Sequence, residues 1–122
     1  MKKMTALLLA ALMVLSMAAC ASKPAEESDL AYIQDKGTLV VGITDFAPMD
    51  YQNESGEWIG FDADLAKAFA DSLGVKVEFV EIVWDNKVLE LDSKTIDCVW
   101  NGMTLTSEVT SAMACSTAYC NN

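Results

Sequence analysis

The sequence contains no arginine and no histidine, and its only basic side chains are eight lysines. Without histidine, the chain has no imidazole to serve as general base, proton shuttle or metal ligand. Ser-His-Asp and Cys-His catalysis are therefore excluded within these 122 residues. The lysines are opposed by 18 acidic residues, which gives a formal net charge of -10. Because nucleic-acid binding requires clustered Lys and Arg to neutralise phosphates, this balance argues against a nucleic-acid partner.

The N-terminus has the three-part pattern of a secretory signal. Lys2 and Lys3 supply positive charge, Met4–Met17 is uncharged and largely apolar, and small residues precede Cys20. The apolar stretch is shorter than the roughly 20 residues that span a bilayer as a helix. A Cys directly after small residues resembles a bacterial lipobox, with Met where Leu is usual three positions earlier. We therefore expect residues 1–19 to be a lipoprotein signal peptide and Cys20 to carry lipid. An ordinary cleaved signal with an incidental Cys is the alternative.

Residues 20–29 are small, polar and charged, which is typical of a flexible tether. Without the two lysines of the signal, six lysines remain against 18 acids, a net charge of -12. Such an acidic domain is not attracted to anionic lipid, so we expect its membrane contact to come from the lipid alone. We expect an exported monomer, anchored by lipid to the outer face of the cell membrane in an extracellular or periplasmic location.

Residues 30–122 alternate between strand-like and helix-like segments. Short apolar or alternating runs predict strands at Thr38–Ile43, Val75–Val83 and Ile96–Trp100. The remaining segments predict helices at Leu30–Lys36, Asp62–Leu73, Trp84–Leu91 and Thr106–Ala112, a hairpin at Tyr51–Ile59 and an extended piece at Ala114–Tyr119. Strands that alternate with helices at this spacing predict an α/β fold with a mainly parallel sheet flanked by helices.

The helix predicted over Asp62–Leu73 has the clearest pattern of the sequence. Asp62 is its predicted N-cap, and Gly74 is a good C-terminal stop. Its apolar positions recur every three or four residues and predict one buried stripe, made of Leu65, Ala66, Phe69, Ala70 and Leu73. Asp62 and Asp64 invite a metal interpretation, but acids near a helix N-terminus more simply favour the macrodipole. We expect no metal and no cofactor.

Four runs occur in order along the chain: G-T-L-V-V-G-I-T-D-F-A-P-M, G-E-W-I-G-F-D-A-D-L-A-K-A-F-A, V-E-F-V-E-I-V-W-D-N and T-I-D-C-V-W-N-G-M-T-L-T. Together they resemble the extracellular solute-binding proteins of polar amino-acid ABC transporters, bacterial solute-binding protein family 3. The resemblance covers Gly37 to about Tyr119. It implies a periplasmic-binding-protein-like (type II) fold with two lobes and a ligand between them. Residues 30–122 are then a partial lobe 1, with the hinge and lobe 2 missing because of a fragmentary record or a truncated gene.

The resemblance implies a first ligand contact in the loop after the first strand. Phe46 fits the position of a stacking aromatic, and Asp45 beside it is placed to take an ammonium. A free amino acid needs such acceptors, together with donors for its carboxylate, in a largely water-free cleft. A core aromatic and a loop cap are the alternative roles of Phe46 and Asp45.

A second contact is expected at Asn101-Gly102-Met103-Thr104, where a strand ends and where open α/β sheets bind ligands. Gly102 lets the backbone approach the ligand, and Thr104 offers a hydroxyl and an amide N–H. A turn without a ligand is the alternative. Trp84 and Trp100 are candidate pocket walls, although Trp more often serves plain packing.

One departure from the family pattern concerns the ligand carboxylate. The resemblance implies T-x-E-R, in which Arg grips the carboxylate bidentately, but the chain has Thr106-Ser107-Glu108-Val109. A charge-assisted hydrogen bond contributes about 1.5–3 kcal/mol, so its loss costs roughly tenfold or more in affinity. A ligand with a masked or absent carboxylate, or a cation from the missing half, would resolve the departure.

The cysteines beyond the signal allow more than one state. Cys98 lies in an apolar strand and is expected to be a buried free thiol. Cys115 and Cys120 are five positions apart, which permits a disulfide if the backbone turns, and free thiols if it does not. A metal site is not expected without His or a fourth nearby thiol.

The function best supported is therefore capture of a small polar solute, an amino acid or a relative, by a lipoprotein that delivers it to an ABC transporter permease. A ligand-sensing input domain of a membrane receptor is the first alternative. A dehydratase-type enzyme on the same scaffold is the second, with Glu108 as its only candidate acid or base. We expect no catalytic residue.

Overall fold

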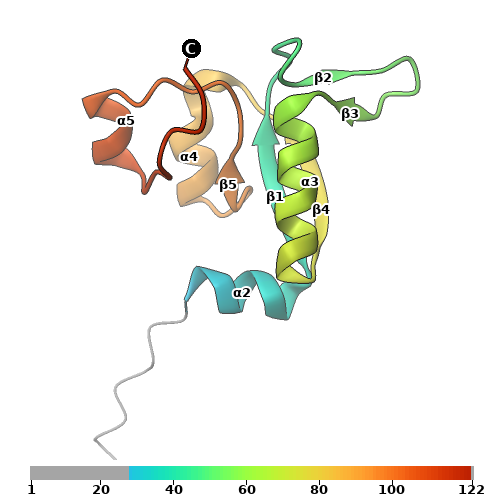
Figure 1. The fold of residues 1–122 in the computed structure, drawn as a ribbon. Coiled ribbons are helices and arrows are strands. Elements are labelled where there is room, and N and C mark those ends of the chain that lie inside the picture. Colours follow the sequence, from blue (N-terminus) through green and yellow to red (C-terminus); the bar gives the residue numbers. More distant parts are fainter. Residues whose placement is uncertain (1–27, 122) are drawn as a thin grey trace, which may run out of the picture.

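The computed structural model describes residues 28–121, so the predicted signal peptide, the lipid attachment at Cys20 and most of the tether lie outside the described residues. The elements follow one another as α2 Asp29–Lys36, β1 Thr38–Ile43, β2 Tyr51–Gln52, β3 Trp58–Ile59, α3 Phe61–Leu73, β4 Lys76–Glu81, η2 Trp84–Asn86, α4 Lys87–Asp92, β5 Cys98–Val99 and α5 Ser107–Ala112 (Figure 1). The predicted alternation of strands and helices is confirmed. No helix of the described part has both the length and the apolar character needed to cross a membrane.

β1 is the centre of a three-stranded parallel sheet with the order β4–β1–β5. β1 pairs with β4 along its whole length and with β5 through two residue pairs. The strand predicted over Ile96–Trp100 is assigned only at its two central residues. The ladder nevertheless continues, because Asp97 N–H donates to Val40 O (2.8 Å) and Trp100 N–H donates to Gly42 O (3.0 Å). The predicted parallel sheet is therefore confirmed. The hairpin predicted over Tyr51–Ile59 is present as β2 and β3.

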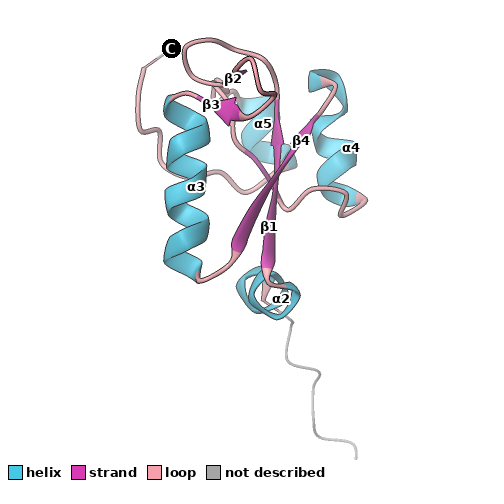
Figure 2. Ribbon diagram, turned by 90° about the vertical axis from the view of Figure 1, so that its right-hand side faces the viewer, coloured by secondary structure: helices cyan, strands magenta, loops and turns pink. Residues whose placement is uncertain are grey.

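The core lies between β1 and α3. Three alternate residues of β1 and three alanines of α3 are almost fully buried: Leu39, Val41, Ile43, Ala63, Ala66 and Ala70. Because alanine is small, α3 lies close against the strand, and apolar surface is removed from water on both elements. Figure 2 shows α3 on one side of the sheet and α4 on the other, so both faces are covered.

The predicted stripe of α3 is partly wrong. Ala66 and Ala70 are buried as predicted, but Leu65 and Phe69 are 36% and 44% exposed. Consecutive helical residues are rotated by about 100°, so Leu65 and Phe69 lie beside the face that meets β1. The small residues set the buried face, because they allow the closest approach to the sheet.

The predicted N-cap of α3 is also wrong. Gly60 is the N-cap, and it has no side chain with which to cap the helix. Phe61 N–H donates to Pro48 O (3.4 Å) and Asp62 N–H to Met49 O (2.9 Å), so loop carbonyls satisfy the first amides. Gly60 has φ +114°, and a Cβ there would lie 2.4 Å from Met49 O, so this junction requires glycine. The side chain of Asp62 is buried instead of capping the helix.

Three further boundaries differ from the predictions. α2 begins at Asp29, and Ser28 accepts the Ala31 N–H as its N-cap, so the end of the predicted tether is part of the helix. β4 ends at Glu81, because the chain then turns into η2. The predicted extended piece Ala114–Tyr119 forms no strand.

An ion pair joins α2 to the start of β5. Lys36 Nζ lies 2.6 Å from Asp97 Oδ2, and the Asp97 side chain is only 4% exposed. The same carboxylate accepts the Val40 N–H (2.7 Å). This buried acceptor therefore holds the helix, the central strand and the β5 segment together.

Candidate functional site

The loop after β1 carries Asp45 and Phe46 to the carboxyl end of the sheet. Phe46 N–H donates to Asp50 O (2.6 Å) and Asp50 N–H donates to Phe46 O (3.0 Å), which closes residues 46–50 into a tight turn. We call residues 46–50 the Phe46 turn. The Phe46 side chain is 50% exposed, so it is not a core aromatic, and Asp45 is exposed beside it.

The loop after β5 meets the Phe46 turn. A Cβ on Gly102 would lie 2.5 Å from Phe46 Cε1, so the phenyl ring rests directly on this glycine. Asn101 Nδ2 donates to Thr44 Oγ1, which links the ends of two adjacent parallel strands. The structure therefore brings together Phe46, Asn101 and Gly102, at the edge where open α/β sheets bind ligands. We call this set the loop cluster.

The other predicted residues lie around or apart from the loop cluster. Met103 is half-buried and Thr104 is exposed, directly after the cluster. Lys87 Nζ lies 4.6 Å from the centroid of the Trp84 ring, so one face of this indole is covered by the chain's own cation. The Trp100 ring lies 5.6 Å from the Phe69 ring and packs against α3. Among the described residues, neither indole forms a ring pair with Phe46.

The position that the family pattern gives to Arg offers no charge. Val109 is half-buried in the first turn of α5, and its N–H donates to the N-cap Thr106 Oγ1 (3.2 Å). Glu108, the candidate acid or base of the enzyme alternative, is exposed in the same turn. This turn therefore supplies a carboxylate and an apolar side chain, but no side-chain cation for a ligand carboxylate.

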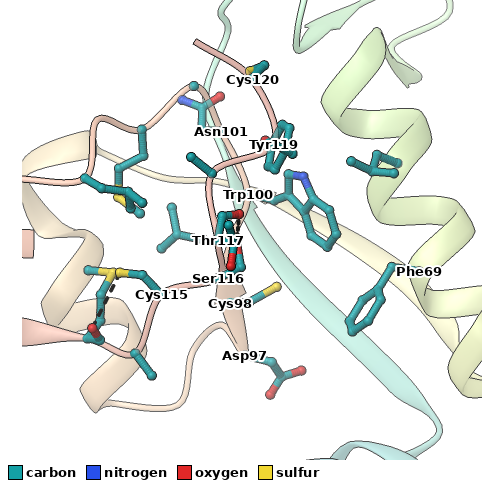
Figure 3. Close-up of a pocket in the computed structure, with 18 of the residues that line it drawn as sticks. Phe69, Asp97, Cys98, Trp100, Asn101, Cys115, Ser116, Thr117, Tyr119 and Cys120 are labelled. Atoms are coloured by element: carbon teal, nitrogen blue, oxygen red, sulfur yellow. Dashed lines mark hydrogen bonds between the residues drawn. The ribbon is translucent and has the colours of Figure 1, made fainter. Parts of the chain in front are cut away.

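A cavity of about 760 Å³ lies between α3, β5 and the C-terminal segment (Figure 3). Its walls are mostly apolar and include Leu65, Phe69 and Trp100. Of the predicted ligand contacts, Asn101, Gly102 and Met103 line it, whereas Asp45, Phe46, Trp84 and Thr104 do not. Because the two charges of an amino acid need several donors and acceptors, these walls suit apolar groups better than a zwitterion.

Sequence reasoning missed two buried carboxyls, one at the end of the Phe46 turn and one in the first turn of α3. Asp50 and Asp62 are both 0% exposed. Burial, and then the charge of Asp62, raise the pKa of Asp50 to about 7, while a hydrogen bond from the Ala63 backbone N–H acts in the opposite direction. Burial also raises the pKa of Asp62, against the hydrogen bond that Tyr119 Oη donates to Asp62 Oδ1 (2.6 Å). Burial of the Tyr119 hydroxyl, and then its hydrogen bond with the Asp62 carboxylate, hold the pKa of Tyr119 well above its usual range.

The three cysteines beyond the signal are free thiols. The disulfide considered between Cys115 and Cys120 is therefore not formed in the structure, and Cys115 Sγ instead contacts Met113 O (3.5 Å). Cys98 is a half-buried free thiol. Burial and the neighbouring Asp97 raise its pKa to about 12.

Comparison with known proteins extends these observations. Residues 39–122 match the family described as bacterial extracellular solute-binding proteins, family 3. The chain is 36% identical over 102 residues to the cyclohexadienyl dehydratase of Pseudomonas aeruginosa, covering 83% of this chain and 38% of that one. It is 34% identical over 96 residues to the L-cystine-binding protein TcyJ of Escherichia coli K12, covering 78% and 36%. The chain thus spans less than two fifths of the length of these curated relatives.

A solved structure shares the fold. The arginine-bound form of domain 1 from TmArgBP superposes with a TM-score of 0.62 and 40% identity, over 66% of this chain and 64% of that one. The parallel sheet flanked by helices is therefore that of periplasmic amino-acid-binding proteins, of which the described residues form a part. On the match over residues 39–122, the chain belongs to the bacterial extracellular solute-binding proteins, family 3.

Proposed function

We propose that this chain is part of a solute-binding lipoprotein of an ABC importer, and that the loop cluster is its contact with a small polar solute. The observation that carries the proposal is the half-exposed Phe46 ring lying on Gly102 at the carboxyl ends of β1 and β5. This ring presents one face for stacking, and the glycine leaves backbone groups within reach of a ligand.

The charges around the loop cluster suit the ammonium of an amino acid better than its carboxylate. Asp45 is an exposed carboxylate one residue before Phe46, and Thr104 supplies a hydroxyl beyond Gly102. Val109 gives no cation where the family pattern has Arg. We therefore propose a ligand whose cationic end is held here, an amino acid or a relative. Its carboxylate, where it has one, is held by groups outside the described residues.

The names of the similar proteins support this class of ligand. One curated relative binds L-cystine, and a domain that resembles this chain holds arginine. By its title that structure is of domain 1 in an arginine-bound form, which supports ligand binding by residues of one domain. Delivery to a permease follows from the proposed importer role, and lobe closure around the ligand would signal occupancy.

Anchoring is a separate part of the proposal. We propose that Cys20, after the signal-like residues 1–19, is lipidated and holds the protein at the outer face of the membrane. A single lipid chain binds membranes only marginally, so a stable anchor needs more than one chain. Growth with an alkyne-tagged fatty acid should label the wild-type chain and leave Cys20→Ser unlabelled. Equal labelling of both proteins would remove the anchor from the proposal.

Calorimetric titration of the full chain with arginine, cystine and the other amino acids tests the ligand. Phe46→Ala should weaken the bound amino acid at least tenfold, because the stacked ring contributes about 1.5 kcal/mol or more. Phe61→Ala is the matched control, since Phe61 is similarly exposed (55%) but lies outside the loop cluster, and its effect should stay within about twofold. Equal losses in both variants, or no binding by the wild type, would contradict the proposal.

A dehydratase is the second candidate, favoured by the 36% identity to a cyclohexadienyl dehydratase. Such chemistry needs an acid or base that faces the ligand, and Glu108 is an exposed carboxylate in the first turn of α5. Loss of water from a cyclohexadienyl substrate, followed by ultraviolet absorbance, would establish this candidate if Glu108→Gln abolished the rate. A wild-type rate equal to the buffer rate would exclude it for this chain.

A further inference from the structure

β5 is an edge strand whose outer side has no partner. In the sheet order β4–β1–β5, β5 pairs with β1 alone among the described residues. The other edge strand, β4, carries Lys76, Glu78 and Glu81, exposed charged side chains of the kind that protect an edge from further pairing. β5 consists of Cys98 and Val99 and has no such protection. Its outer side is therefore open to a further strand.

The C-terminal segment, residues 114–120, is a second backbone without a partner. It follows Met113, whose backbone is extended (φ −146°, ψ 154°). In the part of the chain that the structure describes, no backbone–backbone hydrogen bond involves residues 114–120. The sequence predicts an extended piece over Ala114–Tyr119, and a neighbouring strand is what this piece lacks. Its peptide groups are therefore available for pairing.

The cavity of about 760 Å³ lies between these two backbones, and both of them line it (Figure 3). Asn101 Oδ1, on the same cavity wall, is a buried acceptor without a hydrogen-bond partner among the described residues. Gathered apolar side chains that are left exposed mark an interaction site. Those on the walls of this cavity are Leu65, Phe69, Leu105 and Tyr119, which are 36–47% exposed.

We propose that this cavity receives an extended peptide segment, which pairs with β5 on one side and with the C-terminal segment on the other. Added strands gain affinity from main-chain hydrogen bonds and specificity from alternate side chains. The peptide presents apolar side chains to Leu65 and Phe69 of α3, and it carries no acidic residues because this chain has a net charge of -10. A small apolar molecule would leave the backbone groups of both flanking segments unpaired.

The size of a related domain supports a polypeptide as the occupant. The superposition with domain 1 from TmArgBP covers 64% of that chain, so more than a third of that domain has no counterpart in the superposed part. The same sheet thus occurs in a domain with additional polypeptide, and a larger domain buries a greater fraction of its surface. The proposal concerns the sheet edge and does not depend on the solute proposed for the loop cluster.

Two peptides with the same side chains test strand pairing on the full chain. The first is acetyl-Lys-Val-Thr-Val-Thr-Val-Lys-amide, and the second is the same peptide N-methylated at every valine, which removes N–H donors along one edge. At millimolar concentration the first should shift the NMR amide signals of Cys98, Val99 and residues 114–120 together. It should also slow hydrogen exchange at alternate amides of residues 114–120 at least about tenfold. The N-methylated peptide should bind at least about tenfold more weakly, because it cannot complete the main-chain hydrogen bonds.

A matched pair of variants tests the apolar wall. Phe69→Ser should weaken binding of the first peptide at least about tenfold, because the peptide loses its apolar contact with α3. Leu89→Ser is the control, since Leu89 is 65% exposed on α4 and does not line the cavity. Its affinity for the peptide should stay within about twofold of the wild type.

The wild type alone can overturn the proposal, even if Phe69→Ser failed to fold. Equal binding of the two peptides would show apolar burial without strand pairing. Shifts at β5 without shifts in residues 114–120, or no shift at all, would exclude insertion between the two backbones. A dimer without peptide, seen by analytical ultracentrifugation with the β5 amides already protected, would show a second copy at this edge and would equally overturn it.

Discussion

Replacement of Asp50 by Asn should make the protein more stable at pH 8 and leave its stability nearly unchanged at pH 4. Asp50 is 0% exposed, and its pKa rises from 3.8 to about 7 on folding because burial and Asp62 disfavour its charge. A difference of one pKa unit corresponds to about 1.36 kcal/mol, so this shift amounts to at most about 4 kcal/mol. That is a large part of the roughly 5–15 kcal/mol that separates folded from unfolded domains.

The sign follows from proton binding in the two states. Between pH 3.8 and about 7 the folded protein keeps a proton on Asp50 that the unfolded chain has lost. The contribution of Asp50 to the free energy of unfolding therefore falls as the pH rises through this window, and it is constant above it. An amide does not titrate, so the stability of Asp50→Asn relative to wild type should grow by up to about 4 kcal/mol from pH 4 to 8.

Urea unfolding of the full chain, followed by tryptophan fluorescence at several pH values, measures this difference. Trp58 is 92% buried, which makes it a good reporter of unfolding. Other carboxylates contribute equally to both proteins, so the difference isolates Asp50 and its coupling to Asp62. Asp64→Asn is the control, because it makes the same chemical change at an exposed carboxylate of the same helix turn. Parallel stability profiles for wild type and Asp50→Asn, or a less stable variant at pH 8, would refute the reasoning.

Three further changes have defined outcomes. Lys36→Met should lower the free energy of unfolding by about 1–3 kcal/mol in urea titrations, because it leaves the 4% exposed Asp97 side chain without its cation. Gly102→Ala should lower it by about 1–3 kcal/mol, because the new methyl group overlaps the Phe46 ring, and a shifted Phe46 ring resonance in NMR spectra would identify this cause. Cys98, with a pKa near 12, should resist a thiol reagent at pH 8 until urea unfolds the chain, and peptide mass spectrometry would reveal any earlier labelling.

The fold could be predicted from sequence because its signals are local. The β-branched run Thr38–Ile43 and the helical pattern that ends at Gly74 place the two elements of the core within a residue or two. What sequence could not give is the exact face of α3 that is buried. Leu65 and Phe69 have the spacing of a buried stripe. The alanines beside them are buried instead, because small side chains let α3 pack closest to β1, and this depends on the sheet as well as on the helix.

The candidate site was predicted in part, because sheet topology determines some of its contacts and tertiary packing determines the others. Phe46 and Gly102 follow parallel strands, so sheet topology alone places their loops at one edge, and the structure brings them into contact. Trp84 and Trp100 could not be assigned from sequence, since an indole's neighbours depend on tertiary packing. Lys87 lies over one ring, and Phe69 packs against the other.

The charge at the N-terminus of α3 bears on the two buried carboxyls beside it, Asp50 and Asp62. Its 13 residues give this end of the helix a partial charge of roughly +0.5, which favours one negative charge nearby. The Pro48 and Met49 carbonyls already satisfy its first amides, so the Asp62 carboxyl is not used as a cap. Asp62, the predicted N-cap, therefore still lies beside the positive end of the helix dipole, but its carboxyl is buried.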